Sequence, residues 1–190
     1  EVTENGSIKT ICQNSEPSPA PSVDLISIVT GSRSVDWFLR SGAMAVWSIE
    51  SALSRVLKRI DDFRSILDFG CGCGRVLRHL RGYHKLRIYG SDYNQTLVEY
   101  CRHNIGFAKF DTNLAWPPLP YEKDTFDFIY AFSVFTHMPV PQQRAWMNEL
   151  SRVLTKGGFL LLSTHGKYYR RVLFGEDRRK FDAGNIVVHN

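Results

Sequence analysis

The chain has 190 residues, of which 43% are hydrophobic and 23% charged, values that are ordinary for one folded domain with a single core. No apolar run reaches membrane-spanning length and no signal-peptide pattern is visible, so we expect a cytoplasmic protein without a membrane span. Much of the formal net charge of +5 comes from residues 167–180. One such cluster is more typical of a solvated face than of a phosphate track, which argues against a nucleic-acid partner.

The four cysteines show neither a C-x-x-C pair nor a matching histidine spacing: Cys12, Cys71, Cys73 and Cys101. We therefore predict no metal site. Reduced, unpaired cysteines agree with a cytosolic enzyme.

The first part of the chain has no apolar period. It is rich in Asn, Ser and Glu and contains three closely spaced prolines. We predict a flexible tail over residues 1–32 and a folded domain over residues 33–190, with its core at residues 60–166.

A helical pattern begins after Val35. Apolar residues recur at helical spacing and predict a long helix that leads into the first strand: Val46, Ile49, Leu53, Val56, Leu57 and Ile60. Gly42 interrupts the pattern ahead of this helix. Two interpretations of Gly42 stay open, a helix break packed on the core and a residue that lines a ligand site.

A glycine-rich turn follows a short apolar strand that ends near Leu67. Three alternate glycines come next, and then a helix that runs to about Leu80 and buries Val76 and Leu77; the glycines are Gly70, Gly72 and Gly74. Glycine allows backbone angles closed to other residues and lets a ligand touch the main chain. Asp68 stands two residues before the first glycine, where a carboxylate would repel a pyrophosphate but suit a ligand with a positive charge.

Residues 67–75, with the sequence LDFGCGCGR, resemble the first motif of the class I, Rossmann-like S-adenosylmethionine (SAM)-dependent methyltransferases, in their small-molecule branch. The resemblance implies an α/β fold with a doubly wound, mostly parallel sheet in the order 3-2-1-4-5 and helices on both faces. It implies SAM as the cofactor and methyl transfer to a small-molecule acceptor. Asp68, Gly70, Cys71, Gly72 and Gly74 would then bind the cofactor.

A second strand is predicted over residues 86–90, and Asp92 ends it. Asp92 lies 24 residues beyond Asp68, near the interval at which a carboxylate reaches the hydroxyl groups of a ribose. Asp92 could instead cap the helix predicted over residues 95–102, but Asn94 is also suited to that cap. Tyr93 would then lie beside the adenine.

The third strand is predicted over residues 106–110. The resemblance implies a polar residue after it that contacts the adenine, and the spacing does not choose between Asp111 and Asn113. Residues 126–135 form the most apolar run of the chain and predict a central fourth strand. Its carboxyl end, at Ala131, Phe132 and Ser133, should face the cofactor.

His137 follows the fourth strand directly and is our candidate for a general base, because its ordinary pKa lies near neutrality. The alternative is a loop histidine that only packs. A helix is predicted from Pro141, and a fifth strand over residues 159–164.

Family members end their sheet with an antiparallel hairpin, yet only 24 residues follow Gly166. The one remaining strand candidate is residues 186–188. Either the chain is a fragment, or another molecule, such as a second copy, completes the sheet edge.

Three rival functions can be compared with the sequence. A nicotinamide oxidoreductase would need G-x-G-x-x-G, which the loop lacks. Neither the Asn/Asp-Pro-Pro-aromatic turn nor the Pro-Cys nucleophile of DNA methyltransferases is present. A SAM-binding protein without catalysis stays an alternative.

Overall fold

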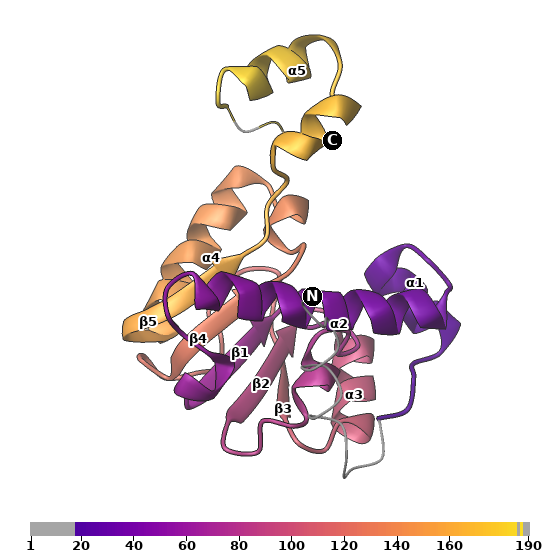
Figure 1. Ribbon diagram of the computed structural model, residues 1–190, viewed down its shortest axis with the longest axis vertical. Helices are drawn as coiled ribbons and strands as arrows, with labels where there is room; N and C mark the ends of the chain where they lie inside the picture. The colour runs from indigo at the N-terminus through magenta and orange to yellow at the C-terminus, as the bar shows by residue number, and fades with distance from the viewer. Residues whose placement is uncertain (1–17, 186, 188–190) are drawn as a thin grey trace, which may run out of the picture.

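The computed structural model describes residues 18–185 and 187, and these form an α/β fold built on one five-stranded parallel sheet (Figure 1). The strand order is β3-β2-β1-β4-β5, as predicted, and each neighbouring pair is parallel. In chain order the strands are β1 (Ser65–Phe69), β2 (Arg87–Asp92), β3 (Lys109–Thr112), β4 (Phe126–Ala131) and β5 (Leu154–Leu162).

Alternate residues of β1 enter two different cores. Ile66 packs with helices α2 (Val35–Ser54) and α3 (Gln95–Asn104) on one face of the sheet, whereas Leu67 packs with α4 (Val140–Val153) on the other. Successive side chains of a strand point to opposite faces, so a central strand that is covered on both sides buries apolar side chains on both. This is why Ile66, Leu67 and Phe69 are all apolar and buried, although the strand also carries Ser65 and Asp68.

Residues 18–32 are not a tail. Helix α1 (Val23–Thr30) occupies most of this range, and its residue Ile26 is fully buried against Phe38 of α2 and Leu97 of α3. Ser22 caps the helix by accepting a hydrogen bond from the Leu25 N–H at 3.4 Å. The predicted tail is therefore wrong here, because the apolar face of α1 finds a partner in α2 and α3; residues 1–17 lie outside the described residues.

Helix α2 runs without a break through Gly42, so the predicted interruption is not found. A Cβ atom at Gly42 would lie 2.0 Å from the backbone oxygen of Arg75. The glycine therefore lets α2 approach the segment that follows the glycine loop. The helix also ends earlier than predicted, at Ser54, which leaves Val56 and Leu57 exposed.

Other boundaries differ modestly from the prediction. Only a short 3-10 turn, η2 (Leu77–Leu80), follows the glycine loop in place of a full helix. A second such turn, η1 (Ile60–Asp62), precedes β1, and a third, η3 (Phe135–His137), follows β4. Strand β3 begins later than predicted, and β5 follows α4 without an intervening loop. These boundaries depend on hydrogen bonding between elements, which local sequence patterns do not contain.

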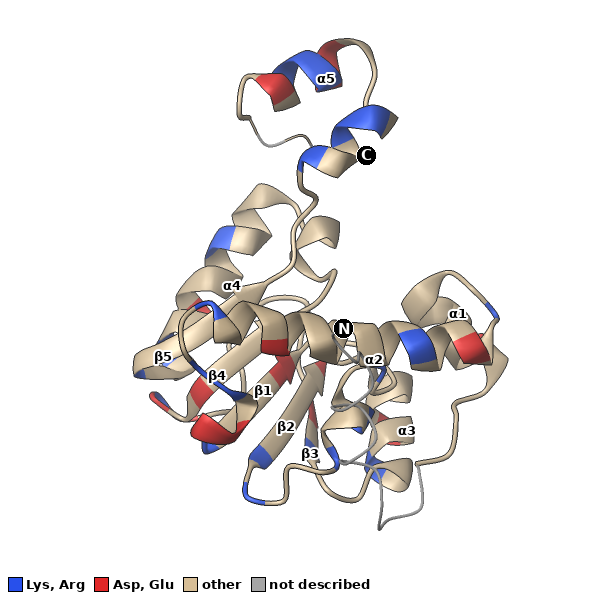
Figure 2. Cartoon of the chain, in the orientation of Figure 1, with Lys and Arg blue, Asp and Glu red and all other residues tan. Residues whose placement is uncertain are grey.

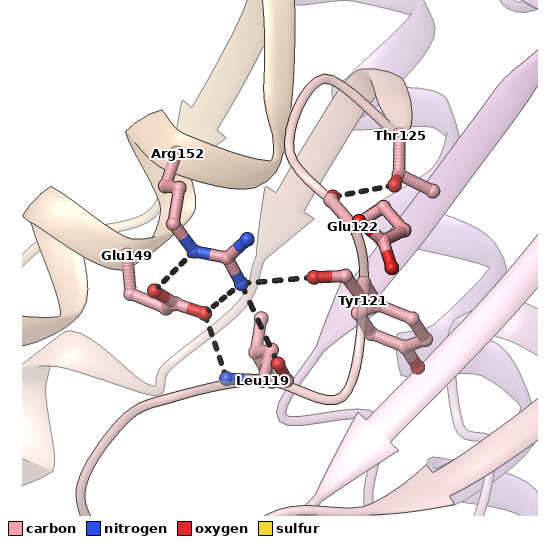
Figure 3. Close-up of polar contacts among 6 residues, drawn as sticks. All are labelled: Leu119, Tyr121, Glu122, Thr125, Glu149 and Arg152. Atoms are coloured by element: carbon pink, nitrogen blue, oxygen red, sulfur yellow. Dashed lines mark hydrogen bonds and ion pairs between the residues drawn. The ribbon is translucent and has the colours of Figure 1, made fainter.

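The segment between β3 and β4 is bound to α4 by a buried carboxylate (Figure 3). Glu149 accepts a hydrogen bond from the Leu119 N–H at 2.7 Å and bonds to Arg152 at 2.6 Å. Arg152 also donates to the Tyr121 carbonyl at 2.9 Å. Arg152 balances the charge of Glu149, and the two side chains together hydrogen-bond the backbone at Leu119 and Tyr121. This cluster therefore fixes the segment that leads from Ala115 to β4.

Beyond β5 the chain forms an arm that extends away from the sheet (Figure 1). It contains η4 (Lys167–Val172) and α5 (Gly175–Asp182), and it carries much of the basic charge (Figure 2). Within residues 18–185 and 187 no strand pairs with the outer edge of β5. The predicted strand at residues 186–188 lies largely outside the described residues, so completion of this edge by another molecule stays a prediction. No helix in the described part of the chain has the length and apolar character needed to cross a membrane.

Candidate functional site

A cavity of about 940 Å³ lies at the carboxyl ends of β1, β2 and β4, where ligands of open α/β sheets bind. Nine of the residues predicted for the site line it: Asp68, Gly70, Cys71, Gly72, Asp92, Tyr93, Asn113, Phe132 and His137. Four others do not: Gly42, Gly74, Asp111 and Ala131. The strand ends and loops that meet here come from distant parts of the sequence, and the sheet brings them together.

The glycine loop follows β1 and needs its glycines for conformation and for space. Gly70, Gly72 and Gly74 have φ angles of +77°, +54° and +76°, in the left-handed region that other residues rarely adopt. A Cβ atom at Gly70 would lie 2.3 Å from Val134, and one at Gly74 would lie 2.4 Å from Ile105. Gly74 therefore serves packing against α3, and Gly70 keeps the floor of the cavity open.

Asp92 binds the glycine loop directly. Its Oδ2 accepts a hydrogen bond from the Gly72 N–H at 2.8 Å, and its Oδ1 accepts one from the Asn94 N–H at 2.9 Å. Burial raises the pKa of the Asp92 carboxyl, and these backbone donors oppose that shift. The helix cap belongs to Asn94, whose side chain accepts from Thr96 and Leu97, so Asp92 is free of that alternative role.

Asp68 is the most deeply buried carboxylate of the cavity, with 3% of its surface exposed. Its Oδ2 has no hydrogen-bond partner within the described residues. Burial raises the pKa of Asp68 to about 7, against the opposing effects of the Tyr130 hydroxyl and the Arg75 guanidinium. The Tyr130 hydroxyl also has no hydrogen-bond partner among the described residues, so Asp68 and Tyr130 do not form a hydrogen bond with each other. A buried acceptor of this kind is costly unless a ligand satisfies it.

Arg75 was not among the predicted site residues, although it lies in the motif itself. Its side chain is half-buried, lines the cavity and donates only one long hydrogen bond, to Ser41 Oγ at 3.4 Å. It forms no ion pair with any described residue. Asp68 and Arg75 thus present opposite charges to the same cavity.

The structure separates the two candidates that follow the third strand. Asn113 is buried, lines the cavity and accepts a hydrogen bond from Ser91 Oγ at 2.6 Å. Asp111 lies in β3 outside the cavity lining, where burial of Tyr121 and then the charge of Asp111 raise the pKa of Tyr121. Asn113 is therefore the residue available to a ligand.

The end of β4 contributes differently from what the sequence predicts. Ala131 is buried beneath the cavity, whereas Phe132 and Ser133 line it. His137, the last residue of η3, lines the cavity and is exposed to solvent.

Sequence reasoning missed one wall of the cavity. Ile28 and Val29 of α1 and Trp37 of α2 line it, and Val29 is the side chain that a Cβ at Gly72 would meet at 2.8 Å. The apolar residues of α1 are the signal that could have revealed this wall. The three prolines before α1 favour a tail, and the predicted tail wrongly included α1 as well.

Residues 66–158 match the model of a family described as a methyltransferase domain. The chain contains a methyltransferase domain. Its sheet order is the one that this methyltransferase fold requires, and the resemblance drawn from residues 67–75 is confirmed.

Several curated proteins are similar to this methyltransferase. The tRNA N(3)-methylcytidine methyltransferase Mettl2 of Drosophila melanogaster is 26% identical over 115 residues, which are 55% of this chain and 35% of that protein. Methyltransferase GfsG of Streptomyces halstedii is 29% identical over 103 residues, 52% of this chain and 36% of that protein. The chain thus spans about a third of the length of these relatives.

A solved structure shares the fold of this methyltransferase. A TehB-like SAM-dependent methyltransferase from Corynebacterium glutamicum superimposes with a TM-score of 0.52 at 21% identity, and the match covers 62% of each chain.

Proposed function

We propose that this methyltransferase chain binds SAM in the cavity above the glycine loop and transfers its methyl group to a small-molecule acceptor. The observation that carries the proposal is the unpartnered Oδ2 of Asp68, buried beside a loop whose glycines leave the backbone open to a ligand. Such an orphaned carboxylate fits a cationic ligand, and SAM carries both an ammonium and a sulfonium.

The remaining residues fit the other parts of SAM. Asp68 would hold the ammonium of the methionine end, and Arg75 would hold its carboxylate. Asp92 keeps unused lone pairs on both oxygens and would accept from the ribose hydroxyls. Asn113 and Tyr93 would border the adenine, since both line the cavity close to Asp92. Tyr93 follows Asp92 directly, and the Asn113 N–H donates to the Asp92 carbonyl at 3.1 Å.

When bound, SAM supplies an already activated methyl group. The task of the chain is to align an acceptor and to exclude water. His137 would take a proton from an acceptor that must lose one, because it lines the cavity after β4 and an imidazole nitrogen can accept a proton.

A small-molecule acceptor agrees with the end of β4, where residues 131–134 lack the Asn/Asp-Pro-Pro-aromatic turn of DNA amino-group methyltransferases. The relatives include a sterol enzyme and a tRNA enzyme. A sterol 24-C-methyltransferase of Debaryomyces hansenii is 28% identical over 105 residues, and the Drosophila relative is named for tRNA. The sequence at β4 therefore argues against the DNA amino-group type, and a tRNA stays the alternative acceptor.

Calorimetric titration with S-adenosylhomocysteine (SAH), SAM and NAD tests the cofactor. We expect one molecule of SAH or SAM to bind and NAD not to bind. Gly70→Ala should abolish binding, because its Cβ would meet Val134 and the φ angle is +77°. Gly106→Ala, which has nothing within 4 Å, serves as the matched control. Absence of SAH binding to the unmodified chain would refute the proposal, and methyl transfer from labelled SAM across a panel of metabolites then tests catalysis.

A further inference from the structure

Apolar side chains from α1, the first turn of α2 and the segment after β4 line a large part of the cavity. We propose that they form a subsite for an uncharged, lipophilic acceptor. This inference rests on the proposed methyltransferase function, and it adds the chemical class of the acceptor.

The wall of this subsite is apolar. Side chains from three separate segments form it, and none of them belongs to the glycine loop: Ile28, Val29, Trp37, Phe132, Val134 and Met138. An acceptor that fills this space removes apolar surface from water, which stabilises binding by about 25 cal/mol per Å² of area buried.

Asp68, Arg75 and Asp92 are the acidic and basic (Asp, Glu, Lys, Arg) side chains among the described residues that line the cavity, and the proposed function uses all three to hold SAM. A charged acceptor beside the apolar side chains would lose its hydration without gaining a free charged partner. The lining therefore selects against ions.

The arginines near this wall are paired with carboxylates and are therefore not free to bind phosphate. Arg33 pairs with Asp24 at 2.9 Å, and Arg40 of α2 forms an ion pair with Asp36. Binding of a nucleic acid needs cations that are free to replace counterions on the phosphates. The basic residues of the arm after β5 lie on a different part of the molecule from α1 and α2 (Figure 2).

Apolar surface continues outward from the subsite. Ile28 is 59% exposed and Trp37 46% exposed, although both line the cavity. Met44, which is 59% exposed, follows Trp37 by seven residues on the same face of α2, about 10 Å away along the helix. Large exposed apolar side chains at the rim of a cavity mark a binding surface, and this run suits an acceptor with an extended apolar part.

The wall is held in place before any ligand binds. Arg78 is buried and donates to the carbonyl of Pro19 at 3.1 Å, ahead of α1. The Tyr100 hydroxyl donates to the same carbonyl at 2.6 Å. At the other end of α1, Val29 packs against Gly72. The subsite is therefore preformed, which lowers the entropic cost of binding.

The test uses the full chain saturated with SAH, and the uncharged fluorescent probe N-phenyl-1-naphthylamine. We expect the probe to bind with enhanced fluorescence, and Ile28→Lys and Trp37→Lys each to weaken its binding at least tenfold. The affinity for SAH should change less than about twofold in both variants. Leu57→Lys, at a 92% exposed apolar residue beyond the end of α2, should leave both affinities unchanged.

Two results would overturn this inference. In one, the probe binds equally well to all variants, so that the wall is not its site. In the other, a short RNA hairpin displaces the probe from the SAH-loaded chain, which would assign the rim to a nucleic acid. Failure of SAH to bind in the calorimetric titration is a separate result and refutes the cofactor assignment instead.

Discussion

The carboxylate of Asp92 accepts a hydrogen bond from the backbone N–H of Gly72, over a distance of 2.8 Å. This contact joins the end of β2 to the middle of the glycine loop, two segments that are 20 residues apart. The residue proposed to hold the ribose thus also fixes the loop on which the cofactor would lie.

Removing this contact should affect both stability and binding. Asp92→Ala leaves the buried Gly72 N–H without an acceptor, which costs about 1–3 kcal/mol of unfolding free energy. We expect SAH affinity to fall more than tenfold as well, as measured by calorimetry, with urea denaturation for stability. The exposed Asp61→Ala is the control, and equal effects of the two substitutions would contradict the proposed role of Asp92.

Gly42 should tolerate no side chain despite its helical conformation. Alanine in place of glycine normally stabilises a helix by about 1 kcal/mol. Here the new Cβ would lie 2.0 Å from the Arg75 backbone oxygen, and the clash with a fixed main chain outweighs that gain. We expect Gly42→Ala to lose at least about 2 kcal/mol in chemical denaturation, whereas Gly106→Ala should stay within about 1 kcal/mol of the original chain.

The buried Asp68 makes the stability of the free protein depend on pH. Because its pKa rises from 3.8 to about 7 on folding, the folded state favours the neutral acid. The contribution of Asp68 to the free energy of unfolding is therefore complete below about pH 4. This contribution is lost as the pH rises through 7, and the loss amounts to up to about 4 kcal/mol. Asp68→Asn, which stays neutral, should therefore gain melting temperature relative to the original chain at pH 8 but not at pH 4.

The same substitution should weaken ligand binding. If the ionised Asp68 holds an ammonium, SAH affinity of the original chain should increase between pH 6 and pH 8, and Asp68→Asn should bind at least tenfold more weakly at pH 8. A variant that matches the original chain in its pH profile for binding would show that Asp68 does not contact the cation.

Arg75 should distinguish ligands by their amino-acid end. Arg75→Gln is expected to weaken SAH binding about 10- to 100-fold, the effect of losing a charge-assisted hydrogen bond. Binding of 5′-methylthioadenosine, which lacks the carboxylate, should change less than twofold. Arg55→Gln, at an exposed position after α2, is the control. Equal losses for the two ligands would show that Arg75 supports the loop and does not contact the carboxylate.

Much of the site follows from local sequence. The alternate glycines at residues 70, 72 and 74 predict the positive φ angles that the loop adopts, and Asn94 caps α3 as its side chain suggests. Two of the places where prediction failed, α1 and Gly42, are helical segments whose neighbours come from elsewhere in the chain. Their conformation depends on burial against α3 and Arg75, and a local pattern does not contain those contacts.

Local sequence alone predicted the strands and the glycine loop, because glycine stereochemistry and apolar periodicity act over a few neighbouring residues. The fold class and the strand order came from the resemblance of residues 67–75 to the methyltransferases. The three-dimensional structure was needed to show that Asn113 and not Asp111 lines the cavity, that Arg75 shares this cavity with Asp68, and that α1 forms one of its walls. These outcomes depend on which side chains from distant segments share one enclosed space, since burial and electrostatic energy are set by distance in three dimensions and not by separation along the chain.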